Sequence, residues 1–336
     1  MVSKKVPITV PEAYPELLHY TSVLGLLGIL DSQSLRATNS AYLNDSTEIN
    51  LFFDTRLAKI LESGIRAELA ADPELQVLPQ FARTPEEGNS AILRYAAEMA
   101  ESIRATTHRF NRPYFACFST PTNDRVRNDG LLSQWRAYGK DGGYCLVFNS
   151  SQLEEIFRAE ATSLWYQHAQ WGDVHYHQDD DDIANAEPEI HEAEEALRKS
   201  IGNFIKNPVP EELESIFEPV SALSCLVKHW GFHEEREVRI VAIPLNHELV
   251  QQGRACGEMR AVRQPKMFVR GGTPVPYLDL FAREQNDNLG FRLPITRVII
   301  GPHPQSELRK ISVEELLRAK VITAEVVISK IPYVGS

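Results

Sequence analysis

Short apolar runs and helix-spaced apolar positions are distributed unevenly along this chain. Continuous apolar runs predict buried strands at 114–119, 144–148 and 297–300. Apolar residues three and four positions apart predict helices, which gather in two blocks instead of alternating regularly with strands. This order favours an α+β fold with a mixed, mostly antiparallel sheet over a regular doubly wound sheet.

Turn and capping residues extend the prediction to the weaker segments. Ser22, Ser90, Ser150 and Ser312 are placed to cap helices, and the first of these helices is expected to bury Leu24, Leu27 and Leu30. Segment 67–88 carries three prolines and is expected to be irregular. Further strands are predicted at 17–22, 35–38, 237–243, 266–270, 276–280 and 325–329, and further helices at 45–61, 131–138, 152–157, 183–206 and 211–230.

Length and composition are those of an ordinary globular protein. The 336 residues are 43% hydrophobic and 24% charged, and we expect a single domain, 1–336, with helical insertions at 55–110 and 179–230. The net charge of −11 disfavours broad nucleic-acid binding. No apolar run has membrane-spanning or signal-peptide length, so a cytoplasmic protein with no membrane partner is expected.

The first candidate site lies at the end of a predicted strand. His19, Tyr20 and Thr21 precede the cap residue Ser22, so polar side chains stand beside the positive end of a helix. Such a place suits an anionic or carboxamide-bearing ligand. The alternative is a structural histidine bonded to backbone, with a plain helix cap after it.

The second candidate site lies between a polar loop and the strand at 144–148. Ser133 and Gln134 stand beside Trp135 and Tyr138, whose rings are suited to stack on a planar ligand. The alternative places Trp135 in the core.

The third candidate site is an acidic and basic segment. In a strand, Glu235, Glu237 and Arg239 alternate onto one face, where the guanidinium can fix the orientation of a carboxylate. Such a carboxylate can bond ribose hydroxyls and stabilise a developing cation. The alternative is an exposed strand face with ordinary ion pairs.

Metal binding is not expected. The run Asp179–Asp182 lacks calcium-loop spacing, and the pair His175 and His177 has no third ligand placed by sequence. The four cysteines form no paired motif, so we read them as reduced.

Together these segments resemble a bacterial family known as domain of unknown function 2971. Each motif is weak alone, and their order along nearly the whole chain carries the resemblance. The motifs are His19-Tyr20-Thr21-Ser22 followed by Leu27-Gly28-Ile29-Leu30, Asn44-Asp45 with Glu48, Cys117-Phe118-Ser119, Leu132-Ser133-Gln134-Trp135, Tyr138-Gly139, Phe232-x-x-Glu235-x-Glu237-x-Arg239, Val298-Ile299-Ile300-Gly301-Pro302 and Ile331-Pro332-Tyr333.

That family in turn looks like a distant member of the ADP-ribosyltransferase superfamily. The resemblance implies an ADP-ribosyltransferase-type sheet and NAD as substrate, with His19 on the nicotinamide ribose and Tyr20 and Thr21 beside the amide. Tyr138 would stack on nicotinamide, in competition with Trp135. Glu237 would bond the ribose and stabilise an oxocarbenium-like transition state, and Glu235 would orient the acceptor. Remaining ligand contacts are expected from Ser119, Ser133, Gln134, Arg239, Asn44 and Asp45.

The resemblance leads to an NAD-consuming glycosyltransferase, in a toxin or antiphage setting, acting on an unknown acceptor such as protein or nucleic acid, or hydrolysing NAD. Two alternatives stay open. One is a non-catalytic nucleotide-binding or interaction module on the same fold. The other is a metal-dependent hydrolase or nuclease that uses Asp45, Glu48 and the Glu235/Glu237 pair.

Overall fold

The described chain divides into two compact units. The first comprises 1–39, 114–174 and 231–336, and the second comprises 40–113 and 175–230. Both predicted helical insertions overlap the second unit. The computed structural model describes residues 9–43, 48–72, 74–75, 81, 85–110, 112–139, 142–177, 188–282 and 292–332.

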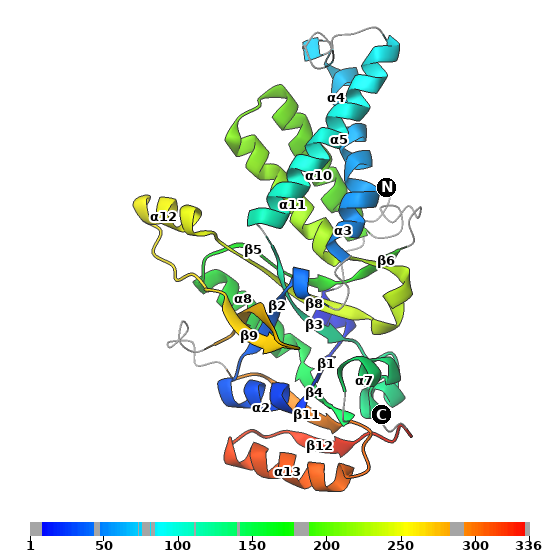
Figure 1. Ribbon diagram of the computed structural model, residues 1–336, viewed down its shortest axis with the longest axis vertical. Coiled ribbons are helices and arrows are strands. Elements are labelled where there is room, and N and C mark those ends of the chain that lie inside the picture. The colour runs from blue at the N-terminus through cyan, green and yellow to red at the C-terminus, as the bar shows by residue number, and fades with distance from the viewer. Residues whose placement is uncertain are drawn as a thin grey trace. The chain divides into compact units, whose positions relative to one another are not determined.

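The first unit is built on a ten-stranded sheet (Figure 1). All its strand pairs are antiparallel except β11 with β12, so the predicted α+β class with a mostly antiparallel sheet is confirmed. The strands are β1 (Glu16–Thr21), β2 (Leu35–Asn39), β3 (Tyr114–Ser119), β4 (Tyr144–Asn149), β5 (Tyr166–Asp173), β8 (Glu237–Pro244), β9 (Lys266–Arg270), β10 (Thr273–Leu280), β11 (Ile295–Ile300) and β12 (Glu325–Ile328).

Strand β3 is the point where this sheet splits. Strand β8 pairs with β3 along all six residues and therefore occupies one whole edge. The other edge is shared: β1 pairs with its end, Leu18 opposite Ser119, and β2 pairs with its start, Thr38 opposite Phe115. From there β1 continues into the order β4-β11-β12, and β2 into β10-β9. Between the two pairings, Cys117 faces no strand on this edge within the described chain.

Helices cover the two faces of the sheet unequally. The helices of this unit are α1 (Val10–Ala13), α2 (Val23–Ser32), α6 (Asp124–Asp129), α7 (Leu132–Tyr138), α8 (Ser150–Ser163), α12 (His247–Ala255) and α13 (Ser306–Ala319); the 3-10 helix η5 (Trp230–Glu235) leads into β8. The larger core joins one face to α2, α8 and α13, and the smaller core joins Leu18 and Tyr20 on the other face to Trp135 of α7.

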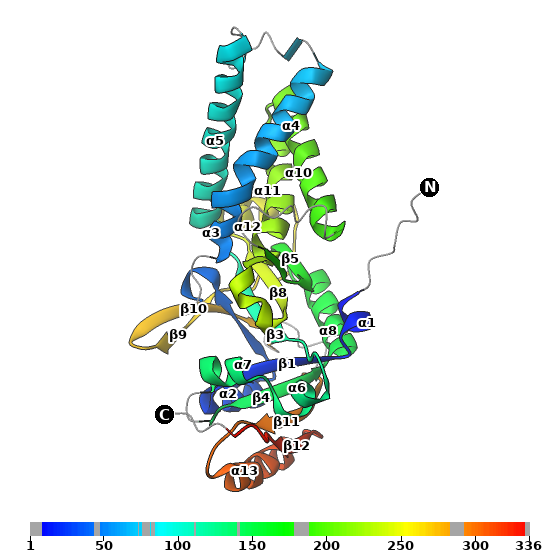
Figure 2. The same cartoon turned by 90° about the vertical axis from the view of Figure 1, so that its right-hand side faces the viewer.

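The second unit is mainly helical. The elements are η1 (Ser40–Tyr42), α3 (Glu48–Phe52), the π-helical turn η2 (Phe53–Leu57), α4 (Ala58–Ala71), α5 (Pro85–Phe110), α10 (Pro188–Lys206), α11 (Pro210–Leu226) and a parallel pair, β6 (His175–His177) with β7 (Val227–His229). Figure 2 shows α4, α5 and α10 running alongside one another, and their apolar faces form a core of their own. The buried carboxylate of Glu194 is held there by Arg56 and Arg198. No described helix combines the length and apolar composition needed to cross a bilayer.

Helix α2 confirms its predicted cap and corrects its predicted buried face. The Ser22 hydroxyl accepts a hydrogen bond from the Gly25 amide at 3.2 Å, as the sequence indicated. Leu24 is 77% exposed, while Leu26 and Ile29 are buried with Leu30. The helix is apolar on nearly every side, so periodicity alone did not fix which side meets the sheet.

Several element boundaries also differ from the prediction. Helix α5 begins at Pro85, a residue suited to a first helical turn, so Ser90 is interior and not a cap. Helix α13 begins at Ser306 instead of after Ser312, and α4 continues to Ala71 into the segment expected to be irregular. Asn149, not Ser150, caps α8. Strand β5 and helices α6 and α12 were not predicted, because polar residues dominate all three.

Candidate functional site

A buried ion pair lies on strand β8 of the first unit. The Arg239 Nε donates to Glu237 Oε1 at 2.6 Å, and its second terminal nitrogen donates to Oε2 at 3.0 Å. Glu237 is 6% exposed and Arg239 is 1% exposed. A two-point bond fixes the plane of the carboxylate, and burial strengthens the field around it. The exposed strand face considered as the alternative is therefore excluded.

The surroundings of Arg239 explain how its charge is accommodated. The guanidinium carbon lies 4.8 Å from the centre of the Phe115 ring on β3, a favourable cation–π arrangement. On the strand at its other side, β5, the residue paired with Arg239 is Gly172, which has no side chain to compete with the guanidinium for space. Neither Phe115 nor Gly172 was predicted as a neighbour of Arg239. The sequence signal that could have indicated them is the alternation of side chains along β3 and β5.

Glu235 does not share the strand with Glu237. It ends the 3-10 helix η5, and Arg236 between them has a left-handed φ of 41°. The period-two argument that grouped Glu235 with Glu237 and Arg239 fails because the chain turns before the strand starts. The shared strand face predicted for Glu235 is therefore wrong, while its role beside the acceptor, which rests on the family resemblance, stays a prediction.

His19 lies where the sheet splits. Its Nδ1 is 2.9 Å from the Cys117 carbonyl oxygen, on the part of the β3 edge where no described residue pairs. A carbonyl only accepts hydrogen bonds, so Nδ1 carries the proton and Nε2 of the neutral ring is an acceptor. The backbone-bonded histidine considered as the structural alternative is thus observed, and it leaves an acceptor atom on the ring.

The register places His19 and Glu237 on different sides of the sheet. Leu18, Ser119 and Glu237 are directly opposite one another across three strands and share a face. His19, the next residue of β1, leaves from the other face, where its ring lies 5.7 Å from that of Phe118. Its bond to Cys117, the residue opposite Arg239, then brings the ring back toward the split.

The charge state of His19 gives a pH dependence that can be measured. Burial lowers the pKa of His19 from its ordinary value of 6.5, against a smaller opposing effect of the Cys117 carbonyl. His19 therefore binds a proton more tightly in the unfolded chain than in the folded protein. As a result, the free energy of unfolding falls as the pH drops below about 6.5. We expect the urea midpoint of the parent to fall more than that of His19→Phe between pH 8 and pH 5. Equal pH profiles for the two proteins would contradict this assignment.

The aromatic residues of the second candidate site serve different purposes. Trp135 is 1% exposed, packs edge-on against Tyr20 at 4.9 Å, and donates its Nε1 proton to the Asp129 carbonyl at 2.9 Å. Tyr20 accepts a bond from the Leu131 amide at 2.8 Å. These two rings are core residues with no face left for a ligand, which corrects their predicted binding roles. Tyr138, at the end of α7, is 41% exposed.

The remaining predicted ligand contacts fall into three groups. Ser119 is buried beside Glu237 in the register, and Thr21 packs its hydroxyl against the first turn of α2, where an added Cβ on Gly25 would lie 1.9 Å from it. Ser133 and Gln134 lie in α7. Asn44 and Asp45 lie outside the described residues. Within the described chain, no three His, Cys, Asp or Glu side chains form a metal-binding group.

Comparison with known proteins bears on the family and not on the activity. The family model described as Protein of unknown function (DUF2971) matches residues 134–240, which confirms the predicted resemblance to domain of unknown function 2971. The matched segment runs from α7 to β8 and contains Tyr138, Glu237 and Arg239. The searches against curated proteins and against solved structures each return no match.

Proposed function

We propose that this protein binds NAD at the split of the first unit's sheet and cleaves the bond between nicotinamide and ribose, as an ADP-ribosyltransferase-like enzyme. The observation that supports this most is the Glu237 carboxylate, which is buried and oriented by Arg239 on β8. Strand β8 pairs with β3, whose other, split edge is the one that His19 bonds. Adjacent strands are about 4.8 Å apart, so β1 and β8, on either side of β3, span about 10 Å. That distance suits a nicotinamide riboside.

Cleavage of this bond requires the protein to position NAD and to stabilise a positive charge on the ribose. The C1′–N bond of NAD breaks with its electron pair leaving on nicotinamide, whose pyridinium is thereby neutralised. A nucleophile on the acceptor, or water, then bonds C1′ and loses a proton. The ribosyl carbon is cationic in between, and a fixed carboxylate in a site of low dielectric stabilises such a cation strongly.

The hydrogen-bonding state or the exposure of each side chain supports its proposed role. The neutral His19 ring offers Nε2 as an acceptor for a ribose hydroxyl, while Nδ1 stays bonded to Cys117. Glu237 keeps one face of its carboxylate toward Arg239. With Trp135 in the core, Tyr138 is the ring of this segment with an exposed surface to cover nicotinamide.

The proposal is tested by incubating purified protein with NAD and measuring free nicotinamide and thermal stabilisation. We expect nicotinamide release by the parent and neither release nor stabilisation in His19→Phe, which keeps a planar ring but no acceptor. Stabilisation without release in the parent would favour the non-catalytic binding module. Release that requires added magnesium or manganese would favour the metal-dependent hydrolase. No effect of NAD on the parent in either assay would refute the proposal.

A further inference from the structure

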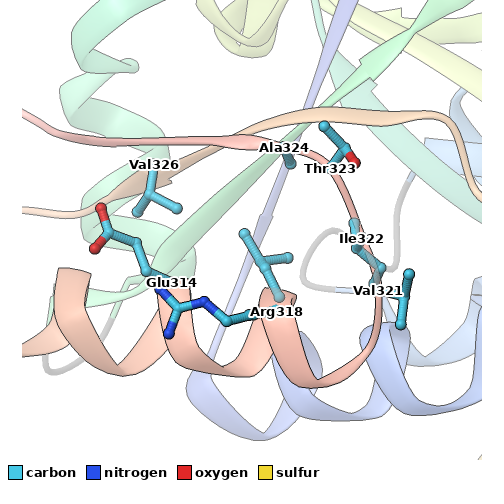
Figure 3. Close-up of a pocket in the computed structure, with 8 residues that line it drawn as sticks. Glu314, Arg318, Val321, Ile322, Thr323, Ala324 and Val326 are labelled. Atoms are coloured by element: carbon cyan, nitrogen blue, oxygen red, sulfur yellow. The ribbon is translucent and has the colours of Figure 1, made fainter.

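A groove lies at the β12 end of the first unit's sheet, between α13 and the segment that enters β12 (Figure 3). It has a volume of about 430 Å³. Its floor is apolar, with Leu317, Ile322 and Val326, and Glu314 and Arg318 stand on its rim. None of the described residues assigned to NAD lines it.

Strand β12 is the last strand of the sheet on this side. It pairs in parallel with β11 through Arg297 opposite Glu325 to Ile300 opposite Ile328, and within the described chain no strand pairs with its other edge. The backbone groups of such an edge can pair with a further extended segment.

The groove lies on the same side as this open edge. Positions 313 and 317 of α13 face the sheet, and Lys320, which directly follows the helix on one flank, bonds Asp31 of α2 at 2.6 Å. Helix α2 covers β1 and β4, so that flank points inward across the sheet. Glu314 and Arg318 lie on the other flank, about 100° around the helix axis from the sheet-facing positions. They therefore border the outer edge of β12.

The charges on the rim indicate what the groove accepts. The Arg318 side chain has no salt bridge or hydrogen-bond partner among the residues that the structure describes, while Glu314 has Lys310 at 3.9 Å. In a chain of net charge −11, a guanidinium with no partner at the edge of an apolar groove attracts a carboxylate.

We propose that this groove binds an extended peptide from another protein, which adds a strand to the open edge of β12. Alternate side chains of such a peptide point to one face, so an apolar side chain enters the groove between α13 and β12 while its neighbours point away. An acidic residue of the peptide pairs with Arg318. The short edge of β12 and the charge on Glu325 limit unspecific strand pairing, so the groove supplies the selectivity.

The experiment selects binders from a random heptapeptide library displayed on phage, using the full chain as bait. Thr323→Trp, at an exposed position lining the groove, is the counter-bait, and Thr273→Trp, at the exposed first residue of β10, is its matched control. We expect enriched peptides with alternating apolar residues and one acidic residue. A fluorescent synthetic copy of the best peptide should bind Thr323→Trp at least tenfold more weakly than the parent and Thr273→Trp equally well.

Two further measurements separate strand addition from other binding. Arg318→Gln should weaken the same peptide several-fold, while Arg125→Gln, an exposed arginine on α6, should not. N-methylation of alternate peptide amides should abolish binding in one of the two registers, and hydrogen exchange in the complex should slow at 323–328. No enrichment over the Thr323→Trp bait, protection elsewhere, or self-association of the parent that Thr323→Trp abolishes would overturn the proposal.

Discussion

Replacing Glu237 by glutamine is expected to lower the rate of nicotinamide release at saturating NAD by about 100-fold or more, on the order of 3 kcal/mol in the barrier. Glutamine keeps the shape of the side chain and an oxygen for one bond from Arg239, but removes the negative charge that we propose stabilises the ribosyl cation. Because the lost interaction is strongest in the transition state, the rate should fall more than NAD binding does.

The control for this variant is a second buried carboxylate. Glu160 is 2% exposed and, like Glu237, is held by two bonds from an arginine, here Arg263. Glu160→Gln therefore imposes a comparable loss of buried charge without touching the proposed site. Melting curves identify the folded fraction of each variant. A folded Glu237→Gln protein that turns over NAD within threefold of Glu160→Gln would rule out the proposed role of Glu237.

Replacing Arg263 by alanine is expected to cost about 3–5 kcal/mol of unfolding free energy. The Glu160 carboxylate that Arg263 binds also accepts bonds from the Tyr166 hydroxyl and the Phe281 amide, both at 2.6 Å. This network joins α8, β5 and the end of β10. Without the guanidinium, the buried carboxylate that holds the Phe281 amide, at a left-handed φ of 68°, loses its counterion.

The midpoint of urea unfolding measures this effect. Arg260→Ala is the matched control, because Arg260 forms a similar two-point pair with Glu258 at the surface, where solvent screens it. We expect the midpoint of Arg260→Ala to stay at the parent value. The double variant Glu160→Leu with Arg263→Met should recover much of the loss, since no unpaired charge then remains. An Arg263→Ala midpoint equal to that of Arg260→Ala would refute the structural role of the network.

The candidate site could be predicted only in part from sequence. The spacing of Glu237 and Arg239 correctly indicated a carboxylate held by a guanidinium, because residues two apart in a strand share a face. The same argument failed for Glu235, since the local turn at Arg236 cannot be read from side-chain type. For Trp135, the sequence could not distinguish a stacking surface from a core residue. Its bond to Asp129 and its packing on Tyr20 show that it is a core residue.

The sequence by itself determined the strands that form the core of the sheet, the helical cap at Ser22 and the α+β class, because each depends on neighbours within one turn or one strand. Only the tertiary structure decided that β1 and β2 share one edge of β3 and that His19 bonds the Cys117 carbonyl between them. It also decided that the half-buried, polar strand β5 pairs with β8. Strand partners lie far apart along the chain. Local periodicity reports which side chains alternate but not which backbone edge they meet.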